Sequence, residues 1–131
     1  MVRYRPIVTV LHALSLCFLF ISTSAHAQER IPPEEASKYV GQSAIVCGTV
    51  ASARYAAKSQ GAPTFLHLGK PSPHQIVTVI IWGHARARFS PPPEELQGQE
   101  VCITGRIALY RGIAQIEVSQ LVQIETTMST R

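Results

Sequence analysis

The segment from Glu100 to Glu125 constrains the fold more than any other part of the chain, because its alternation predicts one long β-hairpin. A two-residue turn at Arg111-Gly112 places apolar side chains opposite each other on one face and mainly polar ones on the other. The pairs expected on the apolar face are Leu109 with Ala114, Ile107 with Ile116, and Gly105 with Val118. The pairs expected on the polar face are Ala108 with Gln115, Arg106 with Glu117, and Thr104 with Ser119. A slip of one residue would mix the two faces, so the pattern favours this register.

Glycines in two expected strands suggest where the sheet bends. Beyond Gly105 the alternation of the hairpin fails, because Ile103 would face Gln120. A bulge at Gly105 restores the alternation and bends the strand, as the closing of a small barrel requires. Gly48 predicts a second bulge in the strand at 43–52.

Three segments upstream of the hairpin have the composition of strands, at 43–52, 64–68 and 76–82. The first two alternate, which divides their side chains between the core and the outer face. The residues expected to point inward there are Val46, Val50, Leu66 and Leu68. The third segment is apolar on both sides, so its sequence does not decide which of its side chains point inward.

The order of these elements predicts the fold class. A short helix or turn is expected at 34–39, and an irregular capping segment at 83–99 separates the third strand from the hairpin. Three strands, a cap and a hairpin fit an all-β, five-stranded Greek-key barrel of the OB type better than a sandwich of seven or more strands.

The N-terminal segment reads as an export signal. A basic start with Arg3 and Arg5 precedes an apolar run at 7–21, and Ala25-His26-Ala27 provides small residues before a cleavage point at Gln28. A membrane anchor is the alternative, but the run is shorter than the ~20 residues that a span needs. We expect a periplasmic or secreted protein without a membrane span after cleavage. The expected divisions are a signal peptide at 1–27, a lead-in at 28–41, an OB-fold domain at 42–125 and a flexible tail at 126–131.

Cleavage would also change the charge. The whole chain has a formal net charge of +4, and without Arg3 and Arg5 it falls to +2. A charge of this size does not by itself indicate a nucleic-acid binder.

Two cysteines remain after cleavage, because Cys17 lies within the signal. Cys47 and Cys102 both point outward in the expected alternation, on the first and fourth strands, which are antiparallel neighbours in an OB barrel. Residues opposite each other on such strands are close enough for a disulfide, and exported proteins keep disulfides oxidised. We therefore predict a Cys47–Cys102 disulfide.

Several strand and turn motifs occur in a characteristic order. They are VCGTV at 46–50, PTFLHLG at 63–69, IIWG at 80–83, VCITG at 101–105 and LYRG at 109–112. In this order they resemble exported bacterial OB-fold proteins classed as nucleic-acid binding, over about residues 41–124. The resemblance implies the fold more specifically than any activity.

Phe65 has a further resemblance. The FxxLG segment that it begins is similar to the second strand of the anticodon-binding OB domains of some aminoacyl-tRNA synthetases, in which the phenylalanine stacks on a base. The similarity implies that Phe65 could stack on a base, which contributes roughly 1–3 kcal/mol. The chain lacks the Asp-Leu-Arg-Asp run that follows this phenylalanine in the synthetases, so their base reading is not implied. The alternative is that Phe65 fills space between the barrel and a loop.

Basic and aromatic residues are expected around Phe65 in the loops that border the groove of an OB barrel. Backbone-tracking, base-stacking grooves require this combination, although a solvated loop surface is the alternative. Arg86 and Arg88 are expected to extend one margin. The candidate nucleic-acid-binding residues are Arg54, Tyr55, Lys58, Phe65, His67, Lys70, Tyr110 and Arg111.

Catalytic and metal-binding patterns are weak. The chain contains no Asp, and its Glu residues are scattered, so the clustered acids of metal-dependent nucleases are missing. His67, His74 and His84 do not have metal-ligand spacing with the cysteines. We expect no enzymatic activity, no metal and no cofactor.

Two functions remain open at the level of sequence. The first is weak binding of single-stranded nucleic acid, in particular DNA, through the face of the second and third strands. The alternative is an envelope stress or interaction module that binds a small molecule, a glycan or a protein in the same groove. Export favours the alternative, because free nucleic acid is scarce outside the cytoplasm, whereas the resemblance and the groove chemistry favour the first. The oligomeric state is left open.

Overall fold

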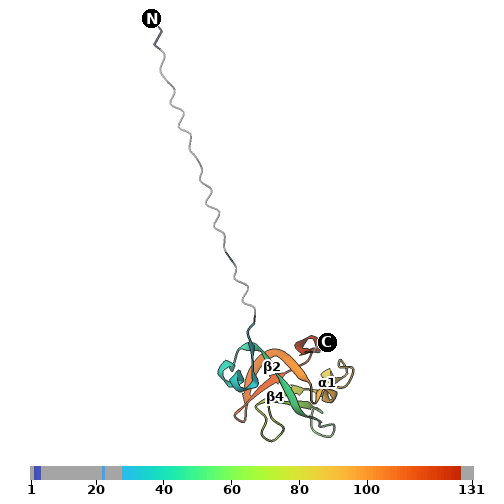
Figure 1. The fold of residues 1–131 in the computed structure, drawn as a ribbon. Coiled ribbons are helices and arrows are strands. Elements are labelled where there is room, and N and C mark those ends of the chain that lie inside the picture. Colours follow the sequence, from blue (N-terminus) through green and yellow to red (C-terminus); the bar gives the residue numbers. More distant parts are fainter. Residues whose placement is uncertain (1, 4–21, 23–27, 128–131) are drawn as a thin grey trace.

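The computed structural model of this protein describes residues 2–3, 22 and 28–127. The export segment expected at 1–27 lies almost entirely outside these residues, as does the tail beyond Thr127. Residues 28–127 form a barrel of strands with short helices around it (Figure 1). No helix within the described ranges is long and apolar enough to cross a membrane.

Five strands close the barrel. They are β2 (Ser43–Tyr55), β3 (Thr64–Leu68), β4 (Val77–Ile81), β5 (Glu100–Tyr110) and β6 (Ile113–Glu117). They are hydrogen-bonded in the order β2-β3-β4-β6-β5, and β2 also pairs with β5, which closes the sheet on itself. Only β4 and β6 pair in parallel within the barrel. The five-stranded OB-type barrel is confirmed.

The two longest strands, β2 and β5, each change partners along their length. The first half of β2 pairs with β5, and its second half pairs with β3. Likewise β5 pairs with β2 in its first half and with β6 from Ile107 onward. The register of β2 against β3 shifts between Val50 and Ser52, which leaves one residue unpaired where β2 changes partner. A bulge of this kind bends a strand and allows a small barrel to close.

The bulges expected at Gly48 and Gly105 are absent. Both glycines lie within a continuous ladder between β2 and β5. Each is placed where another side chain approaches closely: a Cβ at Gly105 would lie 2.6 Å from Ile116 Cγ2, and one at Gly48 would lie 2.6 Å from Pro33 Cγ. These glycines therefore make room for packing.

The hairpin of β5 and β6 is shorter than expected. The turn at Arg111-Gly112 and the pairs from Tyr110–Ile113 to Ile107–Ile116 are present. The ladder ends there, so the further pairs expected for Gly105, Arg106 and Thr104 do not form. The reason is that these three residues pair with β2, while the Val118 N–H donates to the Ile80 carbonyl. Leu109 was expected on the apolar face but is 55% exposed, because the hairpin tip extends beyond the core.

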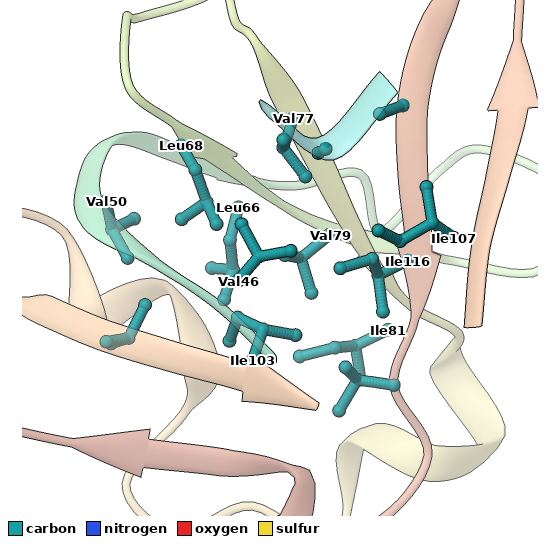
Figure 2. Packing of buried hydrophobic residues seen from close by; sticks show 14 of the residues in the cluster. Val46, Val50, Leu66, Leu68, Val77, Val79, Ile81, Ile103, Ile107 and Ile116 are labelled. Atoms are coloured by element: carbon teal, nitrogen blue, oxygen red, sulfur yellow. The ribbon is translucent and has the colours of Figure 1, made fainter. Parts of the chain in front are cut away.

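Apolar side chains from all five strands fill the barrel. Figure 2 shows them pointing toward one another between the strands. β4 is buried on both faces, which explains why its sequence has no alternation. The core residues labelled there are Val46, Val50, Leu66, Leu68, Val77, Val79, Ile81, Ile103, Ile107 and Ile116.

Short elements cover the barrel. The expected helix is present as the 3-10 helix η1 (Pro33–Tyr39), and the capping segment contains α1 (Gly83–Arg86) and η2 (Pro93–Leu96). Two strands were not expected: β1 (Arg30–Ile31) pairs with β2, and β7 (Ile124–Thr126), which follows η3 (Leu121–Gln123), pairs with β5. Thr126 pairs with Val101 of β5, and the Thr127 N–H donates to the Glu100 carbonyl.

The expected disulfide is present. Cys47 of β2 and Cys102 of β5 are direct partners in the antiparallel register, with Cα atoms 4.0 Å apart, and their sulfurs are bonded. The bond joins the two strands whose pairing closes the barrel.

Candidate functional site

A cleft of about 550 Å³ crosses the outer face of β2, β3 and β4 and reaches the hairpin tip. Its lining includes aromatic, basic and polar side chains, and among the described residues no Asp or Glu lines it. The lining residues are Ser52, Ala53, Arg54, Phe65, His67, Ser72, Gln75, Thr78, Tyr110, Arg111, Ile113 and Gln115.

The floor of the cleft is formed by Phe65 and His67 of β3. Alternation along β3 sends Leu66 and Leu68 into the core, which leaves Phe65 and His67 on the outer face. Their rings are nearly parallel, with centroids 6.2 Å apart and an angle of 8° between the planes. Phe65 is partly exposed, whereas His67 is buried. The accessible aromatic surface of the floor therefore belongs mainly to Phe65.

His67 is held in place by a short chain of hydrogen bonds. Its Nδ1 lies 2.9 Å from Ser52 Oγ, and that hydroxyl oxygen accepts the backbone N–H of Ser72 at 3.1 Å. Burial, and secondarily the positive charge of Arg54, lower the pKa of His67 below its ordinary value. The imidazole is therefore neutral at pH 7. The Ser52 hydroxyl can donate to Nδ1 of the neutral ring, and in that tautomer the ring proton is on Nε2.

Two arginines from different elements line the cleft with Phe65 and His67. Arg54 lies opposite Phe65 in the register of β2 and β3. Arg111 lies at the hairpin tip, where it and Gly112 both have positive φ, 49° and 79°, as a tight two-residue turn requires. Arg111 also lies over the ring of Tyr110, 5.3 Å from its centroid. Neither Arg54 nor Arg111 forms an ion pair within the described residues.

Of the eight candidate residues, the structure brings five into the cleft and leaves three outside its lining. Arg54, Phe65, His67, Tyr110 and Arg111 line it together. Lys58 and Lys70 are exposed on loops and do not line it. Tyr55 follows Arg54 on β2, so its side chain takes the opposite direction and contacts Arg86 instead.

Arg86 and Arg88 do not extend the margin of the cleft, because both are engaged elsewhere. Arg86 binds both carboxylate oxygens of Glu94 at 2.6 Å, donates to Thr64 Oγ1 at 2.8 Å and covers the Tyr55 ring at 3.6 Å. The hydrogen bonds from Arg86 lower the pKa of Glu94 below its ordinary value. Arg88 donates to the Ser119 carbonyl at 3.1 Å. These contacts tie α1 to the barrel.

The sequence pattern missed the polar lining. Thr78 and Gln115 are the polar residues between buried ones on β4 and β6, and they face each other in the parallel register. Alternation on β6 could have indicated Gln115. Nothing local indicates Ser52, Ser72 or Gln75, because a bulge and a loop place them at the cleft. Within the described part of the chain, no group of three or more potential metal ligands occurs.

Comparisons with known proteins show a similarity of fold and nothing beyond it. No protein-family model matches the chain, and no curated protein matches it. A solved structure assigned as an aspartyl-tRNA synthetase from Leishmania major Friedlin has 16% sequence identity and a TM-score of 0.50, over 80% of this chain and 22% of that one. An asparaginyl-tRNA synthetase from Entamoeba histolytica has 17% identity and a TM-score of 0.49, over 77% of this chain and 24% of that one.

A third solved structure is similar in size to this protein. It is the OBody AM1L10 bound to hen egg-white lysozyme, with 18% identity and a TM-score of 0.47, over 79% of this chain and 97% of that one. The chain thus spans less than a quarter of either synthetase. At 16% identity, the likeness to the Leishmania major structure shows a common OB fold and no more.

Proposed function

We propose that this protein binds single-stranded nucleic acid, in particular DNA, in the cleft formed by β2, β3, β4 and the hairpin tip. One observation carries the assignment: among the described residues, an accessible phenylalanine shares a cleft that has no carboxylate with two arginines that have no acidic partner. The likeness to solved structures shows the fold alone. The support for this function therefore comes from the chemistry of the cleft.

Each component of the cleft suits one part of a single strand. The face of Phe65 offers a surface on which any base can stack, for roughly 1–3 kcal/mol per base. Arg54 and Arg111 line the same cleft, where they can neutralise phosphates next to that base. A paired duplex hides its bases from such a floor, so the cleft favours unpaired strands.

Weak, salt-sensitive binding follows from the charge. The residues after 27 have a net charge of only +2, and the cleft itself contributes two arginines. Lys58 and Lys70, on exposed loops, add to the positive potential without lining the cleft. Neither a cofactor nor a chemical step is part of this proposal, and the protein acts as a binding module.

Export is the second part of the proposal. The basic start, the apolar run and the small residues at 25–27 support a cleaved signal and a periplasmic or secreted protein. Intact-mass measurement of the protein recovered from the periplasm or the medium tests it. A mature chain beginning at Gln28 is expected, and a chain that keeps Arg3 contradicts it.

A binding titration tests the function directly. Fluorescence anisotropy of a labelled single strand of about twelve nucleotides, within the ~4–16 nucleotides that OB folds cover, is measured at several salt concentrations. The expected result is binding at low salt that weakens as salt rises, with weaker binding to the matching duplex. No affinity for any single strand at low salt would overturn the proposal and leave a small molecule, a glycan or a protein as the occupant.

A further inference from the structure

The amide of Gln75 has one hydrogen-bonding group that the fold leaves without a partner. Gln75 lies near the end of the loop at 69–76, before β4, and lines the cleft beside Thr78. Its Nε2 donates to Thr78 Oγ1 at 3.4 Å, whereas its Oε1 is buried and accepts no hydrogen bond from the described residues. An acceptor taken out of water without a partner destabilises a protein until a donor reaches it.

The neighbouring Ser52 hydroxyl is already engaged. It contacts both His67 Nδ1 and the Ser72 backbone N–H, so it cannot serve a ligand without breaking a short bond. By contrast, the 3.4 Å bond from Gln75 to Thr78 is close to the upper limit for a hydrogen bond. The amide can therefore pivot about this long bond at low cost, which brings Oε1 to the cleft while Nε2 stays on Thr78 Oγ1.

The position of the amide relates it to the aromatic floor. Thr78 lies opposite His67 in the register of β3 and β4, and His67 lies beside Phe65. The Gln75 amide, bound to Thr78, is therefore at the His67 end of the floor. A base stacked on Phe65 would turn one edge toward it.

We infer that Gln75 selects bases that carry an exocyclic amino group, such as cytosine and adenine, an inference that rests on the proposed function. The amide oxygen accepts a hydrogen bond from the amino group while Nε2 keeps its bond to Thr78. Uracil and thymine have a carbonyl oxygen at the position of the cytosine amino group. The imide N–H on their pairing edge lies between two carbonyl oxygens, which repel a single approaching acceptor.

Oligo-dC and oligo-dU of equal length test this inference with the purified protein at neutral pH. The two strands have the same phosphate charge and ring size, so the electrostatic contribution cancels in the ratio of their affinities. A hydrogen bond of ordinary net strength makes oligo-dC bind roughly two- to tenfold more tightly. Gln75→Leu is expected to bring the ratio close to one by weakening oligo-dC.

Two further variants separate the role of the amide from a general loss of structure. Thr78→Val keeps the side-chain shape and frees Nε2, so the amide can offer a donor and an acceptor, and the ratio is expected to fall through tighter binding of oligo-dU. Gln75→Glu keeps an acceptor and is expected to preserve the ratio while both affinities fall, because its charge repels phosphate. The matched control is Gln42→Leu, on an exposed residue outside the cleft, which is expected to keep the wild-type ratio.

The outcomes distinguish this inference from the proposed function. Equal binding of oligo-dC and oligo-dU by the wild-type protein overturns the selectivity and leaves the proposed function standing. A preference for oligo-dC that persists in Gln75→Leu also overturns the role of Gln75. Failure to bind either strand at low salt overturns both proposals.

Discussion

The rings of Phe65 and His67 lie side by side on the outer face of β3, with centroids 6.2 Å apart and planes only 8° from parallel. His67 is buried and hydrogen-bonded to Ser52, so it supports the position of its neighbour. Phe65 keeps a partly exposed face toward the cleft. A rigid, prepositioned ring costs little side-chain entropy when a base stacks on it.

Replacement of Phe65 by alanine is expected to weaken single-strand binding by roughly 1–3 kcal/mol, which is about a 5- to 150-fold loss of affinity. The slope of log affinity against log salt should stay as it is, because no charge is lost. Anisotropy titrations of the wild-type protein and Phe65→Ala measure both quantities, and Phe65→Tyr should keep most of the affinity. Equal affinity in the alanine variant would show that Phe65 only fills space.

Arg54→Ala and Arg111→Ala should both lower affinity and flatten its salt dependence. Each lost phosphate contact with a single strand reduces the slope of log affinity against log salt by roughly 0.7, and the double variant by roughly 1.4. The measurement is a titration at several salt concentrations for each variant. A slope that does not change in the double variant would contradict the role of these two arginines.

Arg106 provides the matched control for the cleft arginines. It is exposed on β5 opposite Ser43 and does not line the cleft. Arg106→Ala removes the same charge from the protein, so it separates net charge from local contact. Arg106→Ala should leave the affinity for a single strand almost unchanged. Lys58→Ala should lower this affinity less than Arg54→Ala does, because Lys58 does not line the cleft.

Arg86 is expected to matter for stability and not for binding. It joins Glu94, Thr64 and Tyr55, and its guanidinium binds the carboxylate through two parallel hydrogen bonds. Loss of charged hydrogen bonds in Arg86→Ala should lower the free energy of unfolding by roughly 1–3 kcal/mol, measured by urea denaturation. Arg86→Lys should recover little of it, because an ammonium cannot form the paired contact. A stable Arg86→Ala variant with a flatter salt slope would place Arg86 in the binding surface after all.

The expectations from sequence succeed where one local pattern decides the structure. The turn at Arg111-Gly112 and the pair Ile107–Ile116 follow from alternation, and both are present. The bulge expected at Gly105 is wrong, because a break in alternation does not distinguish a bulge from a strand that changes partners. The real bulge, at Ala51, lies in a run of small residues without a clear alternation.

The residues of the cleft also divide into those that a local pattern indicates and those that depend on tertiary contacts. Strand parity is enough to place Phe65 and Arg54 on the outer face. Tyr55 contacts Arg86, which comes from α1 about thirty residues later, and no local pattern indicates such a partner. Gln75 reaches the cleft only because the loop before β4 folds back over the sheet, so its role depends on tertiary structure.

The disulfide between Cys47 and Cys102 should contribute substantially to stability. It closes a loop with a sequence separation of 55 residues, for which the chain-entropy description gives roughly 4 kcal/mol. Reduction of the wild-type protein, or the double variant Cys47→Ala with Cys102→Ala, should lower the free energy of unfolding by up to this amount. Urea denaturation with and without reductant measures it. Reductant should not change the free energy of unfolding of the double variant. If reductant lowered it there as much as in the wild-type protein, the loss would have a cause other than the disulfide.

Burial and the charge of Arg54 lower the pKa of His67 below its ordinary value. The unfolded chain takes up a proton near pH 6.5, before the folded protein does, so the stability linked to this residue is complete above about pH 6.5 and is lost as the pH falls through the folded-state pKa. Bound phosphates favour the imidazolium, so a single strand should reduce this loss. Urea denaturation across this pH range, with and without an oligonucleotide, tests both effects. The slope of stability against pH should become shallower in His67→Gln but not in His84→Gln, which changes an exposed histidine. An unchanged slope in His67→Gln would mean that the pH dependence arises from other groups.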